Sequence, residues 1–150
     1  MQKLLYEIVL NGQREVEKAA RAGITIDDLN NVCWAVVNDG LKKKFSAVGG
    51  KYKLRYKDRP HGVSHLMGEQ EHDGDPFRNY ATQPMKAGWM ISNEPGLYGD
   101  FKIRLNGKTY DETIGIRIED NLVMTSRSCM NLSSIIPKSI KEIERLMADN

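Results

Sequence analysis

The sequence predicts an α+β fold in which two consecutive helices precede a mostly antiparallel sheet and one helix follows it. Apolar residues recur at helical spacing before residue 49, strand-like segments with glycine and proline fill 49–125, and a second helical pattern ends the chain. This order favours helices packed on one face of a sheet. With 150 residues, 40% hydrophobic and 28% charged, we expect a single domain over 1–150 with its own core.

The first helix is expected from about Lys3 to Ala22, because its apolar residues fall three and four positions apart and Gly23 follows it. Thr25 followed three residues later by Asp28 is a capping box, in which each residue satisfies a backbone N–H of the other. The second helix therefore begins after Thr25 and extends to about Lys44.

Alternating or continuous apolar segments predict the strands, and Asn106-Gly107 predicts a tight hairpin turn. The expected strands are an exposed one at Lys51–Lys57, then Gly62–Met67, Trp89–Asn93, Phe101–Leu105 and a long one at Ile114–Thr125.

A final helix is expected to begin at Pro137, since proline is favoured at the first helical position. One face of this helix carries an apolar stripe that we expect to be buried. The stripe consists of Ile140, Ile143, Leu146 and Met147.

The two cysteines, Cys33 and Cys129, match no CxxC pattern, which indicates reduced thiols in a cytoplasmic protein rather than a secreted disulfide scaffold. No run approaches the roughly 20 apolar residues that span a bilayer. The amino terminus also lacks the apolar run of a signal peptide. We therefore expect no membrane partner.

Basic residues are concentrated between Lys42 and Arg59, although the net charge is only +2. With Tyr52 and Tyr56 interleaved, this stretch is compatible with binding a phosphate backbone. The alternative is solvated surface, since lysines complement a helix carboxyl end and protect an edge strand from pairing. We favour solvated surface over nucleic-acid binding.

All three histidines, His61, His65 and His72, fall within twelve residues. Neutral imidazole binds metals and moves protons near pH 7, so this concentration indicates a functional site. On a strand, His61 and His65 would share one face, which would place both side chains in one cleft.

Two carboxylates occupy similarly apolar surroundings. Glu94 follows the apolar strand at 89–93, and Glu119 lies in a run apolar enough to be buried, where a carboxylate is costly unless paired or bound to a cation. One alternative is that Glu119 simply pairs with Arg117, two residues away. The other is a site of one histidine and two carboxylates from three strands, which suits Mn, Co or Zn better than Ca.

Three motifs resemble the Xaa-Pro aminopeptidases, also called aminopeptidase P, which are pita-bread-fold metallopeptidases related to prolidase and methionine aminopeptidase. The motifs are His61-Gly-Val-Ser-His65 with Gly68 and His72-Asp73, then Asn93-Glu94-Pro95-Gly96-Leu97-Tyr98, then Gly115-Ile116-Arg117-Ile118-Glu119-Asp120. The resemblance covers nearly the whole chain in order and spacing.

The resemblance implies removal of the amino-terminal residue from peptides with proline in the second position. It implies two divalent metals, commonly Mn, with His65, Glu94 and Glu119 as three of five ligands and Glu119 bridging both ions. Glu94 would also carry a proton to the proline nitrogen. His61 and His72 would line the substrate site and take part in catalysis, and Arg117 would orient Glu119 from behind.

The family's other two ligands are aspartates about ten residues apart, upstream of the position that corresponds to the first helix here. We therefore expect 1–150 to be the carboxy-terminal part of a catalytic domain, half of a pita-bread fold, and to be inactive alone. Asp100 and Asp111 have a suitable separation, but they follow Glu94 rather than precede the helices. They are not expected to replace the missing pair.

Two other functions compete with this interpretation. One is a non-catalytic pita-bread module that binds protein or nucleic acid, and the other is a structural domain whose metal-like residues are coincidental. Retention of five site residues argues against the binding module, which has no physical need for them. Because half of the fold would leave apolar sheet surface and strand edges uncovered, we also expect self-association, with a second copy replacing the missing half.

Overall fold

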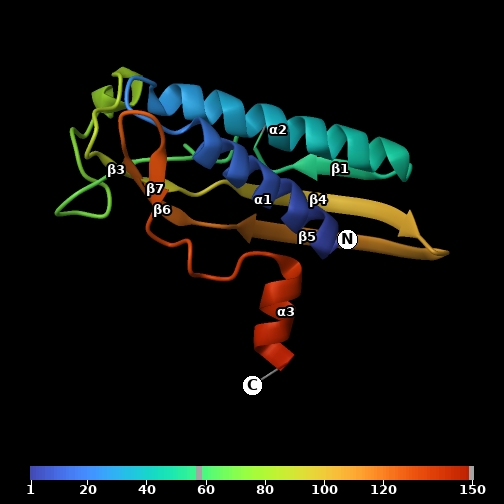
Figure 1. Cartoon of the computed structure of the whole chain (residues 1–150). Helices are drawn as coiled ribbons and strands as arrows, with labels where there is room; N and C mark the ends of the chain where they lie inside the picture. Colours follow the sequence, from blue (N-terminus) through green and yellow to red (C-terminus); the bar gives the residue numbers. More distant parts are fainter. Residues whose placement is uncertain (57–58, 149–150) are drawn as a thin grey trace.

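The computed structural model describes residues 1–56 and 59–148. Lys57, at the end of the predicted exposed strand and within the basic stretch, lies outside the described residues. Helices α1 (Gln2–Ala19) and α2 (Ile26–Ala47) run side by side across the strands (Figure 1). This arrangement confirms the predicted α+β class.

The predicted capping box at the start of α2 is confirmed. Thr25 Oγ1 accepts a hydrogen bond from the Asp28 backbone N–H at 3.0 Å, and Asp28 Oδ2 accepts one from the Thr25 N–H at 2.9 Å. Helix α1 ends at Ala19, earlier than expected, because Ala20 is extended and the Ala22 N–H donates to the Thr125 carbonyl instead.

A three-stranded antiparallel sheet has the order β1 (Lys51–Leu54), β4 (Gly96–Leu105), β5 (Lys108–Arg117). Strands β4 and β5 form the hairpin predicted at Asn106-Gly107, where both residues have positive φ, +51° and +77°. This geometry is that of the tight turns that match strand twist. Strand β4 begins five residues before the predicted Phe101.

A second, four-stranded antiparallel sheet has the order β2 (Leu66–Met67), β3 (Met90–Asn93), β6 (Asp120–Met124), β7 (Cys129–Asn131). The single strand expected over 114–125 is therefore wrong, because the chain leaves one sheet after Arg117 and enters the other at Asp120. The strand expected at Gly62–Met67 is also mostly wrong. Val63 N–H donates to the Asn30 side chain at 2.7 Å rather than to a strand partner.

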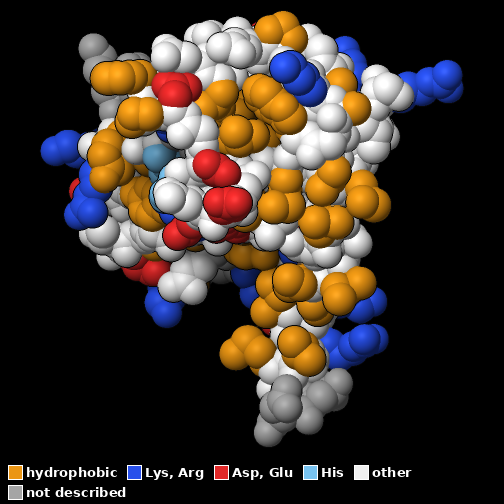
Figure 2. Space-filling model, turned by 90° about the vertical axis from the view of Figure 1, so that its left-hand side faces the viewer, with side chains coloured by type: hydrophobic (Ala, Val, Ile, Leu, Met, Phe, Trp, Pro, Cys, Tyr) orange, Lys and Arg blue, Asp and Glu red, His pale blue; other side chains and the backbone are white. Residues whose placement is uncertain are grey.

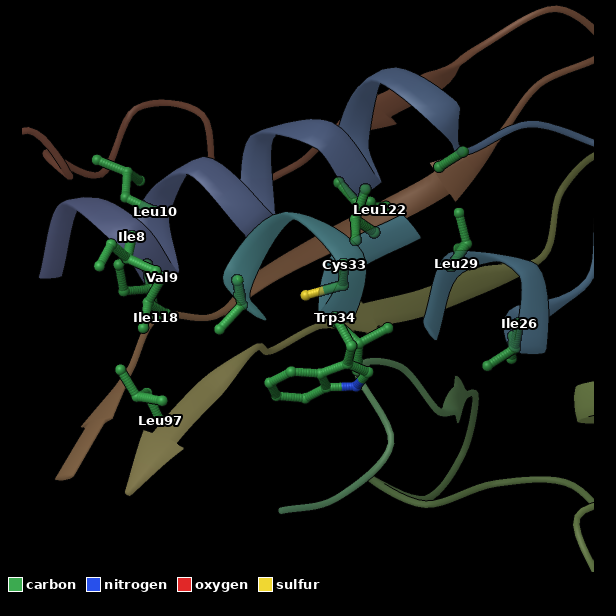
Figure 3. Packing of buried hydrophobic residues seen from close by; sticks show 14 of the residues in the cluster. Ile8, Val9, Leu10, Ile26, Leu29, Cys33, Trp34, Leu97, Ile118 and Leu122 are labelled. Atoms are coloured by element: carbon green, nitrogen blue, oxygen red, sulfur yellow. The ribbon is translucent and has the colours of Figure 1, made fainter. Parts of the chain in front are cut away.

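The core lies between the two long helices and the sheets. Figure 3 shows that each layer contributes side chains, such as Val9 from α1, Cys33 from α2 and Leu97 from β4. The helices approach closely at Gly12, where a Cβ would lie 2.8 Å from a Val37 methyl group. Burial raises the pKa of the Cys33 thiol to about 12, so Cys33 is a packing residue.

The last helix, α3 (Ile140–Ala148), projects from the rest of the molecule (Figure 1). The expected burial of its stripe is wrong: Ile140 and Ile143 are only partly buried, and Leu146 and Met147 are 54% and 73% exposed. Figure 2 shows hydrophobic side chains gathered over this helix. The helix packs beside the start of α1, where Lys3 pairs with Glu144 and where Tyr6 lies near Ile140 and Ile143.

Among the described residues, no helix is both long and apolar enough to cross a membrane.

Candidate metal site

The candidate site lies where two neighbouring chain segments cross from one sheet to the other. Asn93 of β3 is paired with Asp120 of β6 in the four-stranded sheet, and Gly96 of β4 is paired with Arg117 of β5 in the three-stranded sheet. The short connections between these pairs contain Glu94 and Glu119. The two carboxylates are therefore brought together by the antiparallel register on both sides.

His65 comes to the same place from the segment before β2. Its backbone N–H donates to Ser92 Oγ at 2.9 Å, its carbonyl accepts from the Ser92 N–H, and the Glu94 N–H donates to the Val63 carbonyl at 2.8 Å. Ligand atoms of His65, Glu94 and Glu119 all lie within 4.8 Å of one another. The structure thus brings together the three residues that the sequence singled out as metal ligands.

Glu94 is a buried carboxylate with partners on both oxygens. It is 8% exposed, and Oε1 lies 3.1 Å from His65 Nε2 and accepts a hydrogen bond from Ser92 Oγ at 3.2 Å. Oε2 lies 3.2 Å from Arg117 Nη1. These contacts fix the carboxylate in one orientation, which a metal ligand requires.

The direct pair of Arg117 with Glu119 that was left open does not form: the ion pair of Arg117 is with Glu94, although its charge also lowers the pKa of Glu119. The reason is the register: Arg117 is paired with Gly96, two residues after Glu94, so its guanidinium reaches that carboxylate. Its Nε also donates to Tyr98 Oη at 3.1 Å.

Glu119 is exposed, contrary to the burial expected from its apolar run. It occupies the two-residue connection between strands, whose other residue, Ile118, takes the buried position. Partial desolvation raises the pKa of the Glu119 carboxyl, and the negative charge of Glu94 raises it further, while His65 and Arg117 oppose this change. The carboxyl thus lies in a site rich in negative charge that a cation would stabilise.

His65 lies between two acceptors. Its Nδ1 is 3.2 Å from the Leu66 carbonyl, and its Nε2 is 3.1 Å from Glu94 Oε1. The ring nitrogen that faces Glu94 and the carboxylate itself are both groups that bind divalent metals. One imidazole and two carboxylates form a donor set that suits Mn, Co or Zn.

The structure separates the other two histidines. The exposed His72 ring packs on His65, with ring centroids 4.2 Å apart. The His61 ring instead lies edge-on to the rings of Trp34 and Tyr98. Residues 61–65 do not form a strand, so His61 and His65 do not share a strand face as expected. His61 Nε2 is buried without a hydrogen-bond partner among the described residues.

Several residues of the site were missed at the level of sequence. Tyr98 joins His61 to Arg117, and Ser92 bridges His65 and Glu94. The sequence signal for Tyr98 was Gly96, two residues before it in the same motif. In the structure, a Cβ at Gly96 would lie 2.8 Å from both His61 Nε2 and Tyr98 Oη. Glycine is needed at this position for both rings to fit.

Asp100 and Asp111 lie elsewhere, on the β4–β5 hairpin. Asp100 accepts a hydrogen bond from Thr113 at 2.6 Å, and Asp111 pairs with Lys102 at 2.6 Å. Within the part of the chain that the structure describes, His65, Glu94 and Glu119 form the one group of this kind.

Comparison with known proteins agrees with this geometry, because the model for metallopeptidase family M24 matches residues 1–126. The chain belongs to metallopeptidase family M24. It is 32% identical over 98% of its length to an Arabidopsis thaliana protein named intermediate cleaving peptidase 55, mitochondrial, and covers 29% of that protein. It is 30% identical to a probable Xaa-Pro aminopeptidase of Podospora anserina, and this match covers 99% of the chain and 39% of the Podospora protein.

Solved M24 structures show the same fold. Aminopeptidase P from Escherichia coli with the inhibitor Pro-Leu matches 99% of this chain with a TM-score of 0.75 at 25% identity, over 35% of its own length. The zinc-substituted form with product matches with a TM-score of 0.76. The resemblance to Xaa-Pro aminopeptidases and the pita-bread fold are thus confirmed, and the chain spans about a third of the length of the relatives it matches.

The loop of residues 68–74 that carries His72 is closed by Asp73, whose carboxylate accepts from the N–H groups of Glu69 and Gly74 at 3.1 and 2.8 Å. A Cβ at Gly68 would lie 1.9 Å from Asp73 Oδ2. We expect Gly68→Ala to break this closure and to speed amide hydrogen exchange across the loop roughly fivefold or more, the effect of losing about one hydrogen bond. Glu71→Ala, in the same loop and exposed, is the control and should leave exchange unchanged. Equal exchange in both variants would contradict the prediction.

Proposed function

We propose that this chain supplies the carboxy-terminal part of the catalytic domain of a metal-dependent aminopeptidase that removes the amino-terminal residue from Xaa-Pro peptides. The observation that carries the proposal is the convergence of His65, Glu94 and Glu119 within 4.8 Å. Membership of family M24 supports it independently. The substrate, a peptide with proline second, comes from the names of the relatives.

The proposed metal ligands are His65, Glu94 and Glu119, and manganese is the proposed ion. When bound there, a divalent ion would polarise a peptide carbonyl and lower the pKa of a water molecule. The donor set supports this assignment, because His65 Nε2 faces the Glu94 carboxylate, which Arg117 and Ser92 hold in place. Arg117 offsets part of the negative charge and keeps Glu94 in place.

The remaining groups act on protons and substrate in this proposal. Glu94 would take a proton from a water molecule and pass it to the proline nitrogen, and Arg117 holds its carboxylate in place from 3.2 Å. His72, beside His65, binds the peptide at the rim of the site. His61 Nε2, lacking a partner in the described structure, donates or accepts a hydrogen bond at the substrate.

We further propose that the 150-residue chain is inactive alone and that its location is cytoplasmic. The described residues supply one group of three ligands, against five implied by the resemblance to the Xaa-Pro aminopeptidases. Three ligands can hold one ion, but a second ion needs further carboxylates. The free thiols Cys33 and Cys129 support a reducing compartment.

The metal assignment predicts that the chain binds Mn²⁺ and that His65→Ala weakens binding by at least about tenfold, because a ligand and its contact with Glu94 are lost. Isothermal titration with MnCl₂ measures this. Glu71→Gln is the matched control: it removes one negative charge facing Glu119 without removing a ligand, and should change affinity by no more than about threefold. Equal affinity of wild type and His65→Ala would contradict the assignment and favour the non-catalytic module.

The isolated chain is expected to release no alanine from Ala-Pro-Ala in the presence of Mn²⁺. Amino-acid analysis of the incubated peptide, against a buffer blank, measures release. Metal-dependent release by the wild type that is absent in His65→Ala would show that the three ligands suffice, and the inactivity proposal would be wrong.

We also propose that the chain associates with a second copy of itself through the face around α3. Ile135, Ile136 and Met147 are 91%, 57% and 73% exposed there, and β5 is an edge strand. The net charge of +2 offers little repulsion between copies.

Sedimentation velocity across micromolar concentrations should show a dimer, and the double substitution Ile135→Ser with Met147→Ser should weaken it. A single monomeric species at every concentration would contradict this.

A further inference from the structure

A buried charged pair lies behind the candidate metal site, and no step of the proposed reaction uses it. Asp120, the first residue of β6, is 2% exposed, and its Oδ1 lies 2.9 Å from Lys138 Nζ. Burying two charges is costly, and one left without its partner is costlier still. The pair therefore calls for an explanation beyond stability.

Lys138 ends a segment, residues 132–138, that runs beside β6 and that we call the C-terminal strap. The Leu132 N–H donates to the Asn121 carbonyl at 2.9 Å, and the Asn121 N–H donates to Ser133 Oγ at 3.2 Å. The Lys138 ammonium group donates to the carbonyls of Ser133 and Ile136 at 2.9 and 3.1 Å. Asp120 Oδ1 accepts no hydrogen bond among the described residues, so its contact with Lys138 is ionic, and this contact joins the strap to β6.

The other oxygen of Asp120 is held from a different side. Asn131 Nδ2, on β7, donates to Asp120 Oδ2 at 3.0 Å and to Glu17 Oε2 of α1 at 3.2 Å. Asp120 therefore contacts the strap through Lys138 and β7 through Asn131, and Asn131 in turn contacts α1. These contacts hold the start of β6 in position.

Asp120 directly follows Glu119 and is paired with Asn93, which directly precedes Glu94. Asn93 is itself fixed to α1, since its Nδ2 donates to the Gln13 carbonyl at 3.0 Å and its carbonyl accepts from Gln13 Nε2 at 3.2 Å. Neighbouring residues of an extended chain point to opposite faces, so the buried side chains lie behind the two ligands. Glu94 has partners of its own, whereas Glu119 is exposed and depends on its backbone for its position.

We propose that Lys138 is a positioning residue for Glu119, acting through the buried carboxylate of Asp120. The inference rests on the proposed function, because Glu119 is the metal ligand that it positions. The strap neutralises Asp120 and holds the connection at 118–120 so that the Glu119 carboxylate stays beside His65 and Glu94. A residue from the end of the chain thereby contributes to metal affinity without touching the ion.

Mn²⁺ titration of three variants tests the proposal. Lys138→Met should weaken Mn²⁺ binding about tenfold, the usual effect of losing a group that orients a ligand. Asp120→Asn with Lys138→Met removes both charges of the pair, which protects folding, and should still bind Mn²⁺ more weakly because the strap no longer holds residue 120. Lys141→Met, an exposed lysine on α3, is the control and should bind as the wild type does.

Amide hydrogen exchange of residues 118–120 gives a second measurement that needs no metal. It should be faster in both Lys138 variants than in Lys141→Met. A folded Lys138→Met or double variant with wild-type Mn²⁺ affinity would overturn the proposal. If the wild type binds no Mn²⁺, the proposed function fails, and exchange at 118–120 decides the positioning role: equal rates in all variants would overturn it as well.

Discussion

The paired crossing of two segments between two sheets is the constraint on which the site depends. The Ile118 N–H donates to the Pro95 carbonyl at 3.3 Å, which joins the crossings directly. On either side, the registers Asn93 with Asp120 and Gly96 with Arg117 leave each connection only two residues long. Such short connections cannot place their side chains freely, because the strands at both ends are already paired. Backbone hydrogen bonding, not side-chain attraction, thus brings two like charges together.

Keeping two carboxylates close has an energetic cost that the surroundings reduce unequally. Glu94 is buried and paired with Arg117, while Glu119 is exposed, and its pKa is raised first by partial desolvation and then by the negative charge of Glu94. The site is thus electrostatically incomplete without a further positive charge. This imbalance supports the assignment of a divalent ion more directly than the count of ligands, because it follows from positions of charge within the chain itself.

The sequence predicted the helices, the Asn106-Gly107 hairpin and the three residues that converge, because each depends on local periodicity, turn chemistry or a distinctive motif. It did not predict that 114–125 is divided between two sheets. A run in which apolar residues continue on both sides of Arg117 and Glu119 carries no mark of a change of sheet when one of the two connecting residues, Ile118, is itself buried. Burial of α3 was wrong because an amphipathic stripe shows that a helix has a face to cover, not that this chain covers it. Tyr98 and Lys138 were missed because their partners are distant in sequence and are chosen by tertiary geometry.

The loop closed by Asp73 differs from the ligands in how it is held. His65 and Glu94 are fixed by strand pairing and buried contacts, whereas residues 69–72 are exposed and are held by the Asp73 carboxylate and by the Gly68 N–H, which donates to the Gln70 carbonyl. Substitutions in that loop change the surface facing His65 while leaving the ligand backbone untouched. The rim of the site and its ligands are therefore held by separate sets of contacts, so the shape of the rim can change while the positions of the ligands stay the same.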